Sequence, residues 1–143
     1  MVKAKQWEIT TIILASITLV TLGIIGTLGL YAIDLKPPKV KEGDYITIKV
    51  FARQFAWRFE YPDGEKLGQL KIKVGQLVKL ELYSEDVIHS LYIRELGIKK
   101  DVIPGKVNDI WLRVDKAGEF NIFCAEFCGR NHYAMITKLI VEG

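Results

Sequence analysis

The sequence predicts one all-β domain, an antiparallel sandwich or barrel, preceded by a single transmembrane α-helix. Two patterns lead to this prediction: residues 9–33 carry no charge, and several segments after residue 44 alternate apolar and polar side chains. The chain has 143 residues, and the part beyond the uncharged segment can bury one small core but not two. We therefore expect one domain behind one membrane helix.

The uncharged segment has the length of a membrane-spanning helix. Its 25 residues would extend roughly 37 Å at about 1.5 Å per residue, which exceeds a hydrocarbon core of about 30 Å. Trp7 and Tyr31 flank it at positions suited to the membrane interface. A cleaved signal peptide has a shorter apolar region, of about 7 to 15 residues, that ends at small residues. Because this segment is longer and ends in "YAIDLKPP", we predict an uncleaved anchor at residues 9–33 behind a short tail at residues 1–8.

Residues 34–43 are predicted to form a linker, because two prolines and alternating charges disfavour a helix. Beyond it, period-two alternation predicts strands. They span residues 45–51, 70–74, 77–83, 109–114, 119–123 and 136–141. Turn residues such as Pro62-Asp63-Gly64 separate them, and short strands at this spacing are typical of a sandwich or barrel.

The charge pattern excludes one class of partner and leaves the orientation of the helix open. The formal net charge of +3 comes from basic and acidic residues scattered along the chain, without a basic block that could follow a phosphate backbone. Nucleic-acid binding therefore has no support. Lysines occur on both sides of the predicted helix, so the positive-inside rule does not decide which end is cytoplasmic.

Soft metal ligands are concentrated between the last two predicted strands. Cys124, Cys128, His132 and Met135 follow the spacing CxxxCxxxHxxM, which includes both cysteines and one of the two histidines of the chain. A disulfide would close a loop too short to stabilise the fold much, and would leave the histidine and methionine without a role. A zinc site could combine both cysteines with His132 and the distant His89, but zinc has little use for a thioether. Both remain alternatives.

Copper accounts for every member of the cluster. A mononuclear blue-copper site uses two histidines, one thiolate and a weak axial methionine. His89 supplies the earlier histidine, and the surplus cysteine indicates two copper ions bridged by two thiolates. Such a pair would take one imidazole per ion, Met135 on one ion and a backbone carbonyl on the other. Because an electron shared over two ions changes each bond little, this arrangement favours electron transfer and leaves no open position for a substrate.

Aromatic residues accompany the cluster in two places. Phe123, Phe127 and Tyr133 surround the ligands in the sequence, and we expect them to exclude water from the site. The stretch "RQFAWRFEYP" places aromatic side chains at positions 55, 57, 59 and 61, which predicts one face of a packed strand.

These residues closely resemble subunit II of the haem–copper cytochrome c oxidases, the subunit that carries the dinuclear copper A centre. The resemblance runs from Tyr45 to the C-terminus and rests on "DVIHSLYI", "LGIKKDVIPGKVN" and "CAEFCGRNHYAM". It implies a cupredoxin-like Greek-key barrel at residues 44–143, on the periplasmic side of the membrane. Most members of the family have two membrane helices, so the single predicted helix resembles the short forms of bacterial ba3-type oxidases.

The resemblance also implies roles for individual residues. It implies a set of copper ligands, namely His89, Cys124, Cys128, His132, Met135 and the backbone carbonyl of Glu126. The Glu126 carboxylate would also reach a magnesium ion shared with subunit I, and the alternative for it is a solvated loop acid. Phe55 takes the position of the family's electron-entry tryptophan and Trp57 is the neighbouring aromatic, with a packing role as the alternative for both.

By this resemblance the chain is the electron-entry subunit of cytochrome c oxidase, an oxidoreductase complex. It would accept electrons from cytochrome c at copper A and pass them to haem in subunit I, where oxygen is reduced to water; the chain itself would perform electron transfer only. We expect a single-pass protein of a bacterial or archaeal inner membrane, with residues 1–8 in the cytoplasm. The alternative is a membrane-anchored copper delivery or storage protein. Quinol oxidase subunits lack the copper ligands, and nitrous-oxide reductase needs a further catalytic domain.

Overall fold

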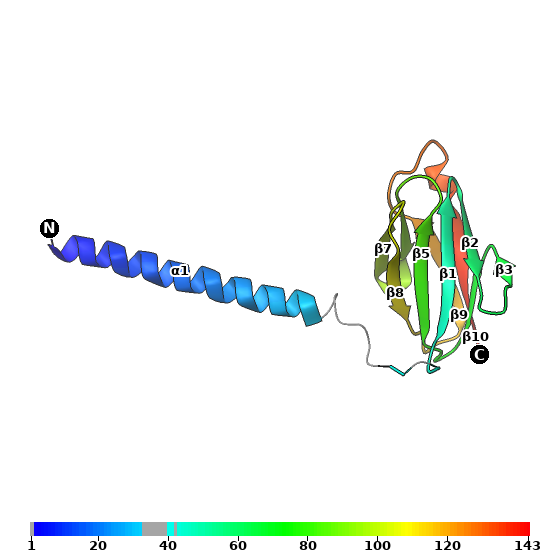
Figure 1. Ribbon diagram of the computed structural model, residues 1–143, viewed down its shortest axis with the longest axis horizontal. Coiled ribbons are helices and arrows are strands. Elements are labelled where there is room, and N and C mark those ends of the chain that lie inside the picture. Colours follow the sequence, from blue (N-terminus) through cyan, green and yellow to red (C-terminus); the bar gives the residue numbers. More distant parts are fainter. Residues whose placement is uncertain (1, 33–39, 42) are drawn as a thin grey trace. The chain divides into compact units, whose positions relative to one another are not determined.

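The computed structural model describes residues 2–32, 40–41 and 43–143. The chain divides into two units, one that contains helix α1 and one that begins at Val40 and contains all the strands (Figure 1). Each unit is described separately.

Helix α1, Val2–Leu30, belongs to the first unit. Its apolar part, Lys5–Leu30, has 26 residues and a mean hydropathy of 2.2, so it is long and apolar enough to cross a membrane. Threonine hydroxyls are satisfied within the helix: those of Thr18 and Thr21 donate to the carbonyls four residues earlier at 2.9 and 2.8 Å. This bonding lets polar side chains lie in an apolar environment.

The boundaries of the helix differ from those expected. The helix begins at Val2, so residues 2–8, which were expected to form a tail, continue it. The uncharged segment does not fix the first residue of the helix, because a helix continues beyond its apolar part wherever its backbone hydrogen bonds can form. Residue 33 and most of the expected linker, residues 34–39 and 42, lie outside the described residues.

The second unit consists of two five-stranded sheets. The first has the order β3-β2-β1-β5-β8, formed by β1 (Ile46–Arg53), β2 (Ala56–Glu60), β3 (Lys66–Leu67), β5 (Val78–Ser84) and β8 (Asn108–Leu112). The second has the order β4-β10-β9-β6-β7, formed by β4 (Leu70–Lys73), β6 (His89–Ile93), β7 (Ile98–Val102), β9 (Gly118–Cys124) and β10 (Ile136–Glu142). Two short 3₁₀ helices, Arg94–Leu96 and His132–Ala134, interrupt the loops.

The predicted strands are confirmed, but the pairing is not purely antiparallel. All six predicted segments form strands with ends within two residues of those expected, the aromatic stretch forms β2, and β3, β6 and β7 add to them. The pairs β1–β5 and β4–β10 are parallel, which corrects the expectation of an antiparallel sandwich. The β1–β5 pair is parallel because the chain continues from β1 through β2 and β3 to β4 in the other sheet before it returns to β5, and such crossovers can bring strands together in the same direction.

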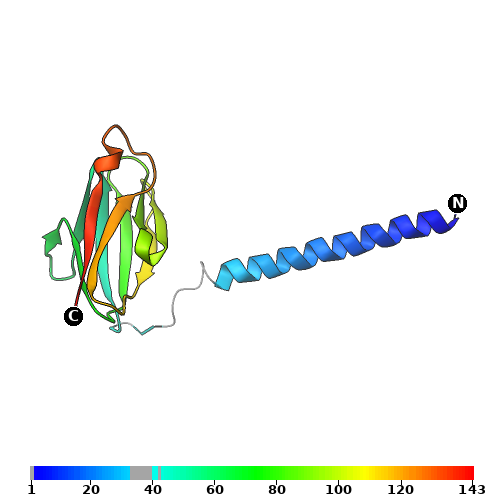
Figure 2. The ribbon, with the colours of Figure 1, turned by 180° about the vertical axis from the view of Figure 1, so that it is seen from behind.

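The core lies between the two sheets. Along β5 the side chains of Val78, Leu80 and Leu82 are fully buried, and the alternate residues are half-buried. Leu91 of β6 and Leu139 of β10 are also fully buried. Strands β6, β9 and β10 lie next to one another, and Figures 1 and 2 show the loop that joins β9 to β10, in orange, at one end of the sandwich. The predicted metal ligands lie in this part of the domain.

Candidate metal centre

The loop between β9 and β10 is closed by the pairing of these two strands. Phe123 of β9 lies opposite Ile136 of β10, and on the loop side of this pair the Cys124 amide donates a hydrogen bond to the Met135 carbonyl, at 3.2 Å. The ligand at each end of the loop is therefore fixed by a sheet. Between them, the His132 amide donates to the Gly129 carbonyl at 3.0 Å, so the loop is folded by its own backbone.

His89 reaches the loop because β6 pairs with β9. It is the first residue of β6, and Leu91, two residues later, lies opposite Cys124. The Ala125 amide also donates to the Ser90 carbonyl at 2.9 Å, which attaches the beginning of the loop to the same strand. The His89 side chain is completely buried.

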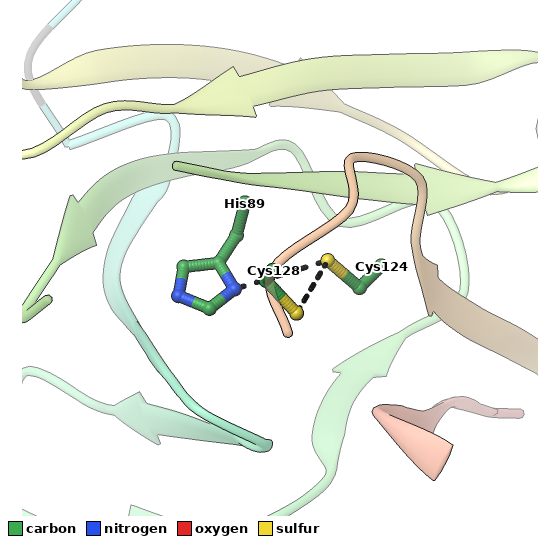
Figure 3. Close-up of side chains that lie close together, drawn as sticks. All are labelled: His89, Cys124 and Cys128. Carbon is green, nitrogen blue, oxygen red and sulfur yellow. Dashed lines mark hydrogen bonds between the residues drawn. The ribbon is translucent and has the colours of Figure 1, made fainter. Parts of the chain in front are cut away.

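The donor atoms of five predicted ligands form two linked groups. The Cys124 and Cys128 sulfurs are 3.8 Å apart. His89 Nδ1 lies 3.8 Å from the Cys124 sulfur, whereas His132 Nδ1 lies 3.5 Å and Met135 Sδ 3.8 Å from the Cys128 sulfur. Figure 3 shows His89, Cys124 and Cys128 pointing toward one another. Thiolate and imidazole donors bound at about 2.0 to 2.3 Å to one tetrahedral ion lie roughly 3.3 to 3.8 Å apart, so these separations suit a metal.

The geometry distinguishes between the alternatives left open by the sequence. Both cysteines are free, and a sulfur separation of 3.8 Å is far longer than the roughly 2.05 Å of a disulfide. The ligand atoms of His89, Cys124 and Cys128 all lie within 4.8 Å of one another and form a possible metal site. His132 is outside that group, although its Nδ1 lies 3.5 Å from the Cys128 sulfur. The two cysteines and two histidines of a Cys2His2 zinc site therefore do not form one such group.

Glu126 presents its carbonyl and its carboxylate to different partners. Its backbone oxygen lies 3.2 Å from the Cys124 sulfur, on the side of the centre that carries His89. Its carboxylate instead pairs with the Lys99 ammonium at 2.8 Å, and both side chains are about half exposed. Only the carbonyl is therefore directed at the sulfur pair. The pKa of Lys99 lies above its ordinary value because it hydrogen-bonds this carboxylate.

The His89 ring is held by an acidic side chain that the motif does not contain. His89 Nε2 lies 2.7 Å from Asp86 Oδ1, so Nε2 carries the proton and Nδ1 is left free for a metal. Burial alone would raise the pKa of Asp86. Hydrogen bonds to the carboxylate from the Gln54 amide, His89 and the Val87 amide outweigh the effect of burial. The pKa of Asp86 therefore lies below its ordinary value.

The thiols lie in a much less polar environment. Cys124 is 8% exposed, Cys128 4% and Met135 fully buried. Burial, followed by the neighbouring Cys124 sulfur, raises the pKa of the Cys128 thiol to about 11. A metal ion that binds this sulfur must therefore displace its proton, which couples metal binding to proton release.

The aromatic residues do not all lie where they were expected. Phe127 is 80% exposed and Tyr133 77%, so the expectation that they enclose the centre is wrong; only Phe123 is half-buried. Loop side chains next to a ligand can point away from it, because a loop has no fixed alternation. The predicted aromatic strand is confirmed as β2: Trp57 is 5% exposed and its ring meets His89 edge-on at 6.3 Å, whereas Phe55 is half-buried at the edge of the core.

Gln54 and Asp86 support the centre, and neither was predicted to do so from the sequence. Asp86 precedes His89 by three residues, which is a usable signal because a metal-bound histidine usually donates its second N–H to a carboxylate or carbonyl. Gln54 has no comparable signal, because its contacts are to residues 32 and 74 positions away.

The chain resembles known proteins over most of its length. Residues 67–142 match the family model described as the periplasmic domain of cytochrome c oxidase subunit II. Cytochrome c oxidase subunit 2 of Alkalihalophilus pseudofirmus is 40% identical over 136 residues, which cover 93% of this chain and 40% of that protein. The chain spans 27–40% of the length of the first curated relatives it matches.

Solved structures share the fold. The periplasmic domain of subunit II of a Bradyrhizobium japonicum cytochrome oxidase is 28% identical, with a TM-score of 0.65 over 71% of this chain and 86% of that one. A chain of a heme-copper terminal oxidase dimer is 29% identical, with a TM-score of 0.63 over 90% of this chain and 96% of that one. The chain therefore belongs to the family of cytochrome c oxidase subunit II, and its two-sheet domain has the cupredoxin-like fold of that family.

Proposed function

We propose that the chain is the electron-entry subunit of a membrane-bound terminal oxidase. It accepts electrons from cytochrome c at a dinuclear copper A centre and passes them to haem in subunit I, where oxygen is reduced to water. The observation that carries the proposal is the pair of buried sulfurs 3.8 Å apart, each with its own imidazole nitrogen within 3.8 Å.

The residues present fit a dinuclear copper centre. When bound, copper would supply a reversible one-electron step. Cys124 and Cys128 would provide bridging thiolates, with His89 and the Glu126 carbonyl on the Cys124 side. His132 and Met135 would provide the donors on the Cys128 side. Burial of the sulfurs excludes water, and Asp86 holds the His89 ring with Nδ1 directed at the sulfur pair.

We also propose, separately from the copper centre, that Glu126 binds a magnesium ion shared with subunit I. The Glu126 carboxylate is paired with Lys99 in this chain. Magnesium would have to displace the Lys99 ammonium or bind the other carboxylate oxygen of Glu126, because Oε1 is already paired with Lys99. The resemblance supports this magnesium site. The site requires that the Glu126 carboxylate be at least partly released from Lys99.

Electron entry near Phe55 and Trp57 fits their positions beside the centre. A Cβ atom on Gly129 would lie 3.1 Å from the Phe55 ring, so this ring packs directly on the ligand loop. Trp57 packs edge-on against His89 but is buried, so a docked partner would reach it only through other side chains. Phe55 is thus the better placed of the two for contact with a donor.

We propose that helix α1 crosses a bacterial or archaeal inner membrane once. Because the donor works on the outer face, the β domain lies on the periplasmic or outer side, and the N-terminal end of the helix is cytoplasmic. Among the described residues α1 is the one helix long and apolar enough to span a membrane, as in the short ba3-type forms that the sequence resembles. A copper delivery protein fits less well, since ligands as buried as Cys128 and Met135 are poorly suited to handing a metal to a partner.

The copper content tests this function directly. Fully loaded protein should contain two coppers per chain with one unpaired electron shared between them, measured by metal analysis and electron paramagnetic resonance. Cys128→Ser should leave at best one copper, because a single thiolate no longer bridges. One tightly bound zinc ion, or a four-line single-copper spectrum in the fully loaded protein, would contradict the proposal.

Replacing the thioether should alter the potential rather than the metal content. In Met135→Leu we expect copper to stay bound, because thiolates and imidazoles dominate affinity and a thioether is a weak axial ligand. The midpoint potential should shift, which voltammetry measures. Complete loss of copper from a folded variant would show that Met135 contributes more to affinity than its weak bonding allows.

Removing the carboxylate behind His89 should weaken copper binding. In Asp86→Asn an amide replaces the acceptor that holds the proton on Nε2, and we expect copper affinity to fall about 10- to 100-fold. Titration against a competing chelator measures it. Glu85→Gln is the control, because the neighbouring Glu85 carboxylate pairs with Arg58 at 2.7 Å instead. Equal affinities in the two variants would show that Asp86 does not orient the ligand.

Docking of the electron donor should depend little on salt. Residues 34–143 contain 18 Lys and Arg and 16 Asp and Glu, so a basic cytochrome c meets no strong opposite charge. The exposed apolar side chains of Phe127 and Tyr133 offer a contact that salt does not screen. We expect only a modest change in stopped-flow rates with the cognate cytochrome as salt rises. A fall of about a hundredfold across the physiological range would indicate electrostatic steering instead, for which Glu85 and Asp86 are the local acids.

A further inference from the structure

Gln54 lies between β1 and β2 and makes hydrogen bonds to both halves of the metal centre. Its backbone N–H donates to Asp86 Oδ2 at 2.7 Å, and its side-chain amide donates to the Cys128 carbonyl. These acceptors lie in two loops that are separated in sequence, the one before β6 and the one between β9 and β10. Gln54 therefore links the two loops.

The backbone contact acts on His89. Asp86 uses Oδ2 for the Gln54 amide and Oδ1 for His89 Nε2, so one carboxylate links the two residues. The Val87 amide, at 2.6 Å, also donates to Oδ1 and limits rotation of the carboxylate. Any side chain at position 54 could keep this contact, because the backbone makes it.

The side-chain contact acts on Cys128 and depends on the next residue being glycine. Gly129 has a φ of +135°, a conformation that other residues rarely adopt. A Cβ atom at this position would lie 2.7 Å from Gln54 Nε2 and 3.1 Å from the Phe55 ring. The loop therefore approaches Gln54 as closely as it does only because position 129 carries no side chain.

We propose that Gln54 is a positioning residue that holds the Cys128 half of the metal centre in register with the His89 half before metal binds. This role deepens the copper function proposed above and rests on it, because its benefit appears only when copper is bound. Ligands that are held in place change their positions little when an electron arrives, which favours electron transfer. The hydrogen bonding itself is a property of the chain without metal, so it can be tested separately.

The test compares Gln54→Met with Gln76→Met in the full chain in detergent. Methionine keeps the length of the side chain and removes the amide donor. Gln76 is a matched control because its amide oxygen also makes one backbone contact, accepting from the Lys73 N–H at 3.0 Å. It lies at the opposite end of the sandwich, since the amide of Val74, two residues earlier, donates to the carbonyl of Glu142 at the far end of β10. Gln54→Asn, which keeps the amide but shortens its reach, provides a second variant should Gln54→Met fold poorly.

Hydrogen exchange of the metal-free protein is the first measurement. In Gln54→Met the amides of residues 126–131 should exchange about fivefold faster, the effect expected for loss of one hydrogen bond, while strand amides keep their protection. Gln76→Met should leave these loop amides unchanged. Unchanged loop exchange in both Gln54 variants would overturn the proposal, and so would faster exchange throughout both sheets, which would indicate a general effect on the fold.

Paramagnetic resonance of the copper-loaded protein is the second measurement. In Gln54→Met we expect two coppers with altered hyperfine splitting, because the Cys128 sulfur is less well held, whereas Gln76→Met should match the unaltered protein. An unaltered spectrum in Gln54→Met would contradict the proposal. If the unaltered chain binds no copper pair, the proposed function fails, and the exchange result still decides the role of Gln54.

Discussion

The 3.8 Å separation between the Cys124 and Cys128 sulfurs is the constraint on which the metal centre depends. Two thiolates at this distance repel each other, and burial raises the pKa of the Cys128 thiol to about 11, so this thiol does not ionise readily on its own. Metal cations remove this penalty by neutralising both sulfurs. The fold therefore holds two soft donors where only a bound metal satisfies them in their charged form.

The sheets and the loops contribute differently to this arrangement. Cys124 ends β9, and its strand pairs on one side with β6 and on the other with β10, so its position is fixed by two ladders. Cys128 belongs to no strand and is held by loop hydrogen bonds, including the one from Gln54. Contacts at the carbonyl of Cys128 consequently have more influence on the sulfur separation than contacts anywhere along β9.

The clustering of the candidate ligands could be predicted from the sequence because four of them lie within twelve consecutive residues with a distinctive spacing. The predicted strands were found because one face of each is more exposed than the other. Strand β6 was missed for the opposite reason: four of its five residues are buried, so its sequence does not alternate. The parallel pairs and the contacts of Gln54 join residues far apart in the chain, and no local pattern encodes them. Their positions in the sequence placed Phe127 and Tyr133 near the ligands but could not show that their side chains point toward solvent.

The exposure of these two aromatics gives the centre two unlike sides. His89 is fully buried, hydrogen-bonded to Asp86 and packed against Trp57, so this imidazole faces the core. His132 is half-buried, and its ring lies 5.9 Å from that of the exposed Phe127. Electron transfer requires close approach but no contact between solvent and the sulfurs. An apolar rim on the His132 side meets both requirements, because a docked protein can cover it while the thiols stay dry.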